Sequence, residues 1–213
     1  GVRCLLAVSA VGSLREDIAP RDMVVPDQLI DRTHGRPSSF FGHGIAAHIA
    51  FDAPYCSEMS EELLGAAANS DVRTHRGGTM MVIDGPAFST RAESALYRAW
   101  GADVIGMTAL PEAKLAREAG ICYATLACVT DYDTWHETHA SVSVDLVVAN
   151  LRANVEQAKG IAAELARRLP PPDACGCASS LRDAIITPRQ LIPEDRRRDL
   201  APILARYLEA ART

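Results

Sequence analysis

Residues 103–129 have the sequence DVIGMTALPEAKLAREAGICYATLACV, and this stretch decides the predicted fold. It begins with a short apolar run and ends with a longer one, from Ile121 to Val129. Between them Pro111 suits the first position of a helix and Gly120 suits its end, which predicts a short helix over 112–119. A strand, a helix and a second strand in succession are typical of an α/β fold.

The same alternation of strand-like and helix-like periods extends along most of the chain. Strands are predicted at 2–10, 22–27, 79–84, 103–107 and 121–129. Further helices are predicted at 91–100, 143–169, 179–186 and 195–211, the first of them after a capping box formed by Thr90 and Glu93. We therefore expect one α/β domain over 1–213, with a mixed, largely parallel sheet flanked by helices. A C-terminal helical tail over 170–213 begins at a triple proline.

The composition is that of a folded protein without a strong overall charge. Of the 213 residues, 48% are hydrophobic and 23% are charged, which provides enough apolar material for a sizeable core. The net charge is -5, so no positive field attracts nucleic acid or anionic lipid. No apolar run approaches the roughly 18 residues of a membrane span, and no cleavable leader is recognisable. We expect a soluble, cytoplasmic protein that binds neither nucleic acid nor a membrane.

Six cysteines are too few and too scattered for a secreted disulfide framework. Cys4, Cys122 and Cys128 lie in apolar strand patterns, so we expect them to be small buried side chains. Cys175 and Cys177 follow the triple proline in a predicted loop. For this pair two interpretations stay open, a strained and easily reduced bridge or two free thiols.

We expect no metal site. The Cys175 and Cys177 pair has no second Cys or His pair at a useful spacing to complete four zinc ligands. His136 and His139 are spaced i, i+3, whereas the zinc-protease motif places its histidines at i, i+4.

Several predicted strands end in residues suited to a small polar or aromatic ligand. These ends carry Ser9 to Ser13, Asp84 to Ser89, Met107 with Thr108, and Thr130 to Asp133. Because the ends of neighbouring parallel strands lie side by side, we expect these segments to form one site. Two carboxylates at i, i+2 just after a buried strand are costly unless they are paired or functional. The residue types alone fix no reaction class.

These segments also resemble a known family. The stretches SAVGSLRED (9–17), DQLIDRT (27–33), GTMMVIDGPAFSTRAES (78–94), WGADVIGMT (100–108) and TDYD (130–133) carry the resemblance. They are similar to the trimeric purine nucleoside phosphorylases and, within that family, to the branch of 5'-methylthioadenosine phosphorylases. The resemblance runs in order from the start of the chain to about residue 169.

The resemblance implies a nucleoside phosphorylase-like fold and phosphorolysis of 5'-methylthioadenosine to adenine and 5-methylthioribose 1-phosphate. Inorganic phosphate is then a co-substrate, and no cofactor is implied. The matching positions imply that phosphate is bound by Ser9, the Ala10 backbone N–H and Thr108, that Met107 lies against the ribose, and that Phe88 and Ile105 line the base pocket.

The resemblance also implies a preference for an adenine-type base. Relatives that act on 6-oxopurines have Asn at the position of Asp131 and Glu at the position of Ser89. A carboxyl can hydrogen-bond an exocyclic amine and, when protonated in a partly apolar pocket, can donate to N7 as the base leaves. Asp131 is therefore the expected general acid. Asp133 is either a supporting group or a cap or turn residue.

The 5' substituent is expected to meet an apolar surface. Val144, Val147 and Val148 match positions beside the family's methylthio pocket, although a helix needs a core face in any case. A histidine at the position of His48 reaches into this pocket from a neighbouring subunit in the family. The resemblance thus implies a homo-oligomer, a trimer or a dimer of trimers.

Two alternatives stay open. The substrate could be methylthioinosine or another purine nucleoside, or the chain could bind a purine without catalysis. The family begins with a strand, a Gly-Gly-Thr-Gly-type phosphate loop and an Arg-His-Gly segment, and this sequence contains neither motif. The chain also enters an apolar run soon after Gly1, so we expect it to be incomplete at its N-terminal end.

Overall fold

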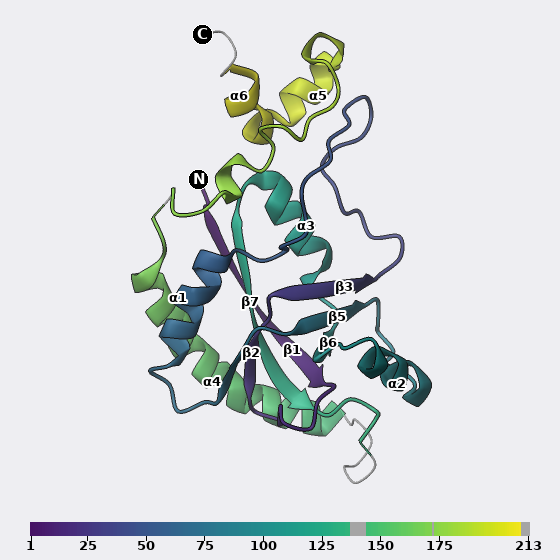
Figure 1. Ribbon diagram of the computed structural model, residues 1–213, viewed down its shortest axis with the longest axis vertical. Coiled ribbons are helices and arrows are strands. Elements are labelled where there is room, and N and C mark those ends of the chain that lie inside the picture. The colour runs from purple at the N-terminus through teal and green to yellow at the C-terminus, as the bar shows by residue number, and fades with distance from the viewer. Residues whose placement is uncertain (137–143, 172, 210–213) are drawn as a thin grey trace.

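A seven-stranded sheet in the order β3-β5-β6-β1-β7-β2-β4 lies at the centre of the protein, in a computed structural model that describes residues 1–136, 144–171 and 173–209 (Figure 1). The strands are β1 Cys4–Ser13, β2 Met23–Val25, β3 Gln28–Arg32, β4 Thr74–Arg76, β5 Thr79–Ile83, β6 Val104–Gly106 and β7 Cys122–Asp131. The helices are α1 Ser57–Ala67, α2 Arg91–Ala99, α3 Ala109–Ala119, α4 Val144–Arg168, α5 Glu194–Asp199 and α6 Ala201–Glu209. Short 3-10 turns lie at Cys177–Ser179 and Arg189–Leu191.

The sheet is mixed and largely parallel, as predicted. Four of its six strand pairings are parallel, and the two antiparallel ones join β1 to β6 and β2 to β7. The long parallel pair β1 and β7 therefore runs opposite to the strands on both sides of it. This reversal determines how the candidate site is assembled.

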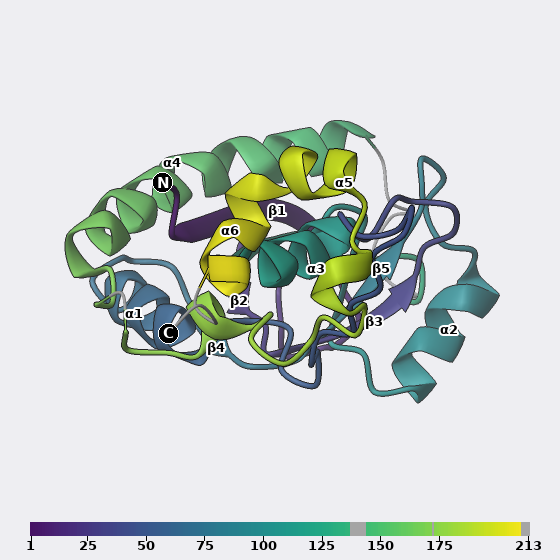
Figure 2. The same cartoon turned by 90° about the horizontal axis from the view of Figure 1, so that it is seen from above.

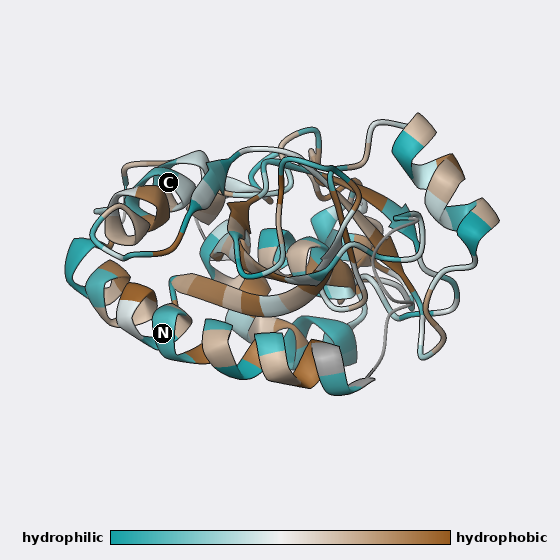
Figure 3. Ribbon diagram, turned by 90° about the horizontal axis from the view of Figure 1, so that it is seen from below, coloured by the Kyte–Doolittle hydropathy of each residue, from teal (hydrophilic) through white to brown (hydrophobic). Residues whose placement is uncertain are grey.

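Helices cover both faces of β7, and all ten of its residues are buried. Side chains at alternate positions, such as Ala124 and Leu126, pack with α1 and α4, while Tyr123 and Ala127 pack with α3 on the other face. Figure 2 shows α4 running the length of this layer. In Figure 3 the central strands are largely hydrophobic, and the helices carry both hydrophobic and hydrophilic residues. A strand covered on two faces explains the continuous apolar run in the sequence.

Local sequence signals correctly predicted the start of α2, the end of α3 and both ends of α4 to within one residue. Thr90 and Glu93 form the predicted capping box at the start of α2. Gly120 ends α3 in the left-handed conformation, at a φ of 67°. The predicted helix over 143–169 is α4, within one residue at each end. However, α3 begins before Pro111, with a non-helical residue at Leu110 inside its first turn.

The first predicted strand needs correction. β1 begins at Cys4 and continues to Ser13, so Val11, Gly12 and Ser13 also lie within the strand, beyond its predicted end at residue 10. Leu5 and Val8 of this strand are exposed. β3, β4 and α1 were not predicted, because short half-buried segments lack a clear apolar period.

The predicted helices of the tail are also partly wrong. Residues 180–184 form turns and not a helix. The backbone here bonds to the 46–48 segment: Ile186 N–H donates to the Ala46 carbonyl, and the Ala184 carbonyl accepts from His48 N–H. The predicted helix over 195–211 is two helices, α5 and α6, and residues 210–211 lie outside the described part of the chain. Pro202 explains the break near Leu200, because proline lacks an N–H and its ring would clash with the carbonyl four residues earlier.

The tail packs on the rest of the chain through a small apolar cluster that contains Ile45, Ile192 and Leu204. All six cysteines are free in this structure, which agrees with the free-thiol interpretation of Cys175 and Cys177. Cys122 and Cys128 are buried as predicted, and Cys4 is half-buried. Among the described helices, none has the length and apolar character to cross a membrane.

Candidate active site

A cavity of about 830 Å³ opens along β1 and reaches the ends of β5, β6 and β7. Ten of the residues predicted for the site line this cavity: Ser9, Ala10, Phe88, Ser89, Ile105, Met107, Thr108, Asp131, Asp133 and Val147. His48 and Val148 are exposed and are not among its lining residues. The side chain of Val144 lies outside the described residues, as do the side chains of Glu137 to His139.

The predicted reason for this convergence holds only in part, because the parallel pairs β1–β7 and β5–β6 do end side by side. We expected the carboxyl ends of parallel strands to meet, but β1 and β6 are antiparallel, with Gly12 opposite Ile105. The chain that leaves β6 therefore passes back along β1. This brings Thr108 beside Ser9, whose hydroxyl oxygens are 2.8 Å apart. Each hydroxyl has an O–H that can donate a hydrogen bond to an oxyanion.

A β-bulge at the end of β7 turns Asp131 toward the cavity. Val11 pairs with Val129 and Gly12 pairs with Asp131, so Thr130 is the extra residue. Its hydroxyl lies 2.7 Å from Asp131 Oδ2, and the Asp133 N–H donates to Asp131 Oδ1 at 2.8 Å. The carboxyl group is thus held in one orientation at the cavity wall.

Burial raises the pKa of the Asp131 and Asp133 carboxyl groups. Asp131 and Asp133 are 7% and 8% exposed, and desolvation raises the pKa of each above its usual value. Within the described chain, the buried atoms Ser89 Oγ and Asp133 Oδ2 have no hydrogen-bond partner. Unpaired buried polar atoms in a cavity wall favour a polar ligand there.

Two asparagines on α4 hold the carbonyl groups that precede Asp131. Asn150 Nδ2 donates to the Thr130 carbonyl at 2.7 Å, and Asn154 Nδ2 donates to the Val129 carbonyl at 3.0 Å. Both are buried and lie one helical turn apart. Sequence reasoning missed them, and the only available signal was a pair of amides at i, i+4 on an otherwise apolar helix face.

Arg36 joins the ends of β5 and β6, and no sequence pattern pointed to this role. Its Nη1 donates to the Met107 and Leu110 carbonyls, and its Nη2 donates to those of Ile83 and Asp84. Its Nε also donates to Asp84 Oδ1. Because all five N–H donors of the guanidinium are used, Arg36 fixes the position of Met107 and is not free to bind an anion.

Gly85 and Phe88 shape another part of the cavity wall. Gly85 has a φ of +68°, and a Cβ there would come within 2.4 Å of Met107 Sδ, so only glycine leaves room for Met107. Phe88 is 47% exposed at the cavity, which leaves its ring available for stacking on a planar ligand.

Residues 1–167 match the family model described as the phosphorylase superfamily. The chain belongs to this superfamily. The predicted resemblance is therefore confirmed, and so is the predicted nucleoside phosphorylase-like fold.

Relatives within the superfamily are similar over nearly the whole chain. The S-methyl-5'-thioadenosine phosphorylase of Geobacter sulfurreducens is 51% identical over 98% of this chain and 73% of its own length. That of Gloeobacter violaceus is 52% identical over 97% of this chain and 71% of its own length. A methylthioadenosine phosphorylase from an antarctic soil metagenomic library has a solved structure with a TM-score of 0.88 and 44% identity, covering 96% of this chain and 72% of that one.

Replacing Gly12 tests how closely the wall of the cavity is packed in this chain. A Cβ at this position would lie 3.0 Å from Asp131 Oδ1 and 3.2 Å from Ile105 Cγ2. We expect Gly12→Ala to lower the free energy of unfolding by about 1–3 kcal/mol, as overpacking does. Gly160→Ala is the control, because a Cβ there meets nothing within 4 Å and alanine favours a helix. Urea unfolding of both variants measures the effect, and equal stabilities would contradict this account.

A second test concerns the pH dependence of stability. The raised pKa of Asp131 means that the folded state holds its proton more tightly than the unfolded chain. Its contribution to stability is present below the unfolded pKa of about 3.9 and is lost as the pH rises through the folded pKa. We therefore expect Asp131→Asn to gain stability relative to the parent as the pH rises from about 4 toward neutrality. Urea unfolding at a series of pH values measures this, with the exposed Asp71→Asn as control. A relative stability that stays constant would show that Asp131 titrates normally.

Proposed function

We propose that the protein is a 5'-methylthioadenosine phosphorylase, which cleaves the N-glycosidic bond with inorganic phosphate to give adenine and 5-methylthioribose 1-phosphate. The observation that carries this proposal is the buried Asp131 carboxyl in the same cavity as the paired hydroxyls of Ser9 and Thr108. Curated relatives at about 50% identity are named S-methyl-5'-thioadenosine phosphorylases, and the chain is a phosphorylase of the same superfamily.

Asp131 acts as the acid for the leaving base. The N-glycosidic bond breaks toward an oxocarbenium-like transition state, and its electron pair moves onto the purine ring. A protonated Asp131 donates its proton to N7, which neutralises this charge. The carboxylate that remains accepts from the Thr130 hydroxyl and the Asp133 N–H, both already in place. These two donors need no rearrangement during the step.

Phosphate binds on the opposite side of the sugar. The Ser9 and Thr108 hydroxyls and the Ala10 N–H donate to its oxygens, and one phosphate oxygen bonds to C1' of the ribose as the base leaves. Met107, fixed by Arg36, packs against the ribose. None of these roles needs a cofactor, and phosphate is consumed as a co-substrate.

Apolar contact selects the 5' substituent. Val147 of α4 lines the cavity and offers methyl groups to a thiomethyl group. Such burial stabilises binding by about 0.8 kcal/mol per CH₂, whereas a hydroxyl would lose its hydrogen bonds to water. Ser89 and Phe88 surround the base, with the unpaired Ser89 hydroxyl available to a ring nitrogen.

The reaction is tested by measuring phosphate-dependent base release from methylthioadenosine, methylthioinosine, adenosine and inosine. We expect methylthioadenosine to be the best substrate. Asp131→Asn should lower kcat by roughly 10²–10⁴-fold, the usual contribution of a general acid. Asp71→Asn is the matched control and should keep full activity, since Asp71 is exposed and does not line the cavity. Full activity of Asp131→Asn, or dominant turnover of inosine, would contradict the proposal.

We also propose that the protein is a cytoplasmic homo-oligomer, a trimer or a dimer of trimers. Its six free thiols suit a reducing compartment. His48 is exposed and outside the cavity of its own chain, as expected of a residue that completes a neighbour's site. Light scattering should give a multiple of three chains, and His48→Ala should raise KM for methylthioadenosine without changing that mass. A fully active monomer would contradict the assembly.

A further inference from the structure

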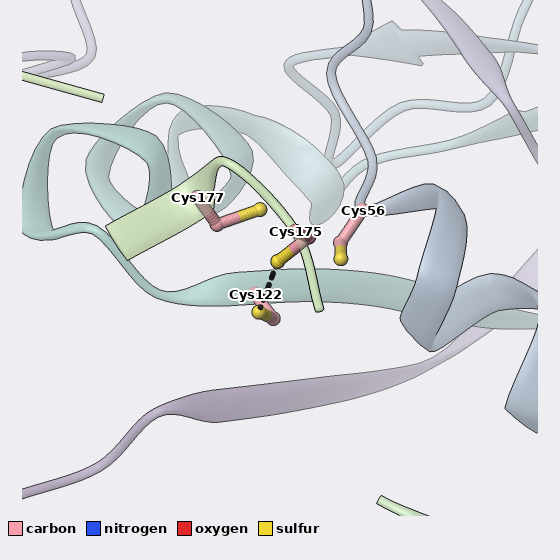
Figure 4. A group of neighbouring side chains, drawn as sticks. All are labelled: Cys56, Cys122, Cys175 and Cys177. Carbon is pink, nitrogen blue, oxygen red and sulfur yellow. Dashed lines mark hydrogen bonds between the residues drawn. The ribbon is translucent and has the colours of Figure 1, made fainter. Parts of the chain in front are cut away.

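Four cysteines from separate parts of the chain meet at the end of β7 that lies away from Asp131. Cys122 is the first residue of β7, Cys56 precedes α1, and Cys175 and Cys177 belong to the tail (Figure 4). The strand between Cys122 and Asp131 is about 30 Å long at the usual rise per residue. The cysteine cluster is therefore distinct from the catalytic end of the sheet.

The sulfur atoms have the separations of a metal site. All four Sγ atoms lie within 4.8 Å of one another, and those of Cys122 and Cys175 are 3.4 Å apart. In a tetrahedral site with Zn–S bonds of about 2.3 Å, neighbouring sulfur atoms are about 3.8 Å apart. A disulfide needs a sulfur–sulfur separation of about 2.05 Å. The observed 3.4 Å between Cys122 and Cys175 differs more from that value than from the separation in a zinc site. A central zinc ion thus requires only small side-chain shifts.

The second pair of ligands is what the sequence could not reveal. We expected no zinc because the tail pair had no partner pair at a useful spacing. The fold provides that partner in Cys56 and Cys122, which are far apart in the sequence and adjacent in space. This changes the donor set from two sulfur atoms to four, which is the set that structural zinc sites use.

The surroundings suit a closed, structural site. Cys56, Cys122 and Cys177 are buried, and they belong to the apolar cluster that includes Met59 and Leu63 of α1. Cys175 is half-buried and packs against the same apolar cluster, so water has limited access to the sulfur atoms. The N-terminus of α1 at Cys56 adds a positive dipole end, which favours the negative charge of four thiolates around one dication.

We propose that Cys56, Cys122, Cys175 and Cys177 bind one structural Zn²⁺ ion that fastens the tail to β7 and α1. On binding, each thiol gives up its proton and forms one Zn–S bond, so no electron transfer is involved. The segment from 169 to 176 contains no helix or strand among its described residues. A metal bond to Cys175 and Cys177 would anchor the chain directly after it.

Metal analysis tests the site directly. The full chain, purified under reducing conditions, should contain about one zinc per chain. Cys177→Ala and Cys56→Ala should each lose most of this zinc. Cys4→Ala is the matched control and should keep all of it, because Cys4 is a half-buried cysteine that packs against the same apolar cluster without being a ligand.

Cobalt gives a readout that does not depend on the variants folding. Metal-free parent protein titrated with Co²⁺ should develop thiolate-to-cobalt charge-transfer bands and the d–d bands of a tetrahedral site, saturating at one equivalent. Zinc should then displace the cobalt and raise Tm. Two results would overturn the proposal: four reactive thiols with neither zinc nor cobalt bound, or a disulfide among the four cysteines in protein handled without oxidant.

Discussion

The burial of β7 on both faces is the constraint on which the rest of the structure depends. Its ten residues contact α1 and α4 on one side and α3 on the other, while β1 and β2 bond to its two edges. A strand with no exposed face cannot change its register without moving every layer that packs on it. The residues at its two ends therefore have little positional freedom. The carboxyl end carries the buried Asp131, and the amino end carries Cys122 of the cysteine cluster.

At the carboxyl end, this rigidity makes a costly arrangement possible. Two carboxyl groups are buried there, and burial alone would destabilise their charged forms. The two asparagines of α4 donate hydrogen bonds to the backbone carbonyl groups beside the bulge at Thr130. The free-energy cost of burial therefore arises at the carboxyl groups and not at the neighbouring backbone. A carboxyl whose pKa is raised by burial is better suited to donating a proton to a leaving base than one with the ordinary pKa.

At the amino end, the cysteine cluster connects the tail to the same strand. The tail in turn contacts the segment that carries His48, through the Ala184 carbonyl and through the Thr187 hydroxyl, which accepts from the Ala46 N–H. Fastening the tail therefore also positions the residue that we assign to a neighbouring subunit's site. One strand thus links the proposed acid at one end to the proposed zinc site at the other.

The sequence by itself determined the α/β class, the long buried strand, the capping box of α2 and ten of the residues that line the cavity. These features are local, because apolar period, caps and short motifs depend on neighbouring residues. Only the tertiary structure decided that β1 and β6 are antiparallel, that Arg36 uses all its donors on carbonyl groups, and that Cys56 and Cys122 meet the tail cysteines. An apolar strand has the same pattern whichever way its neighbour runs, and contacts between distant segments depend on how the layers pack rather than on any local spacing.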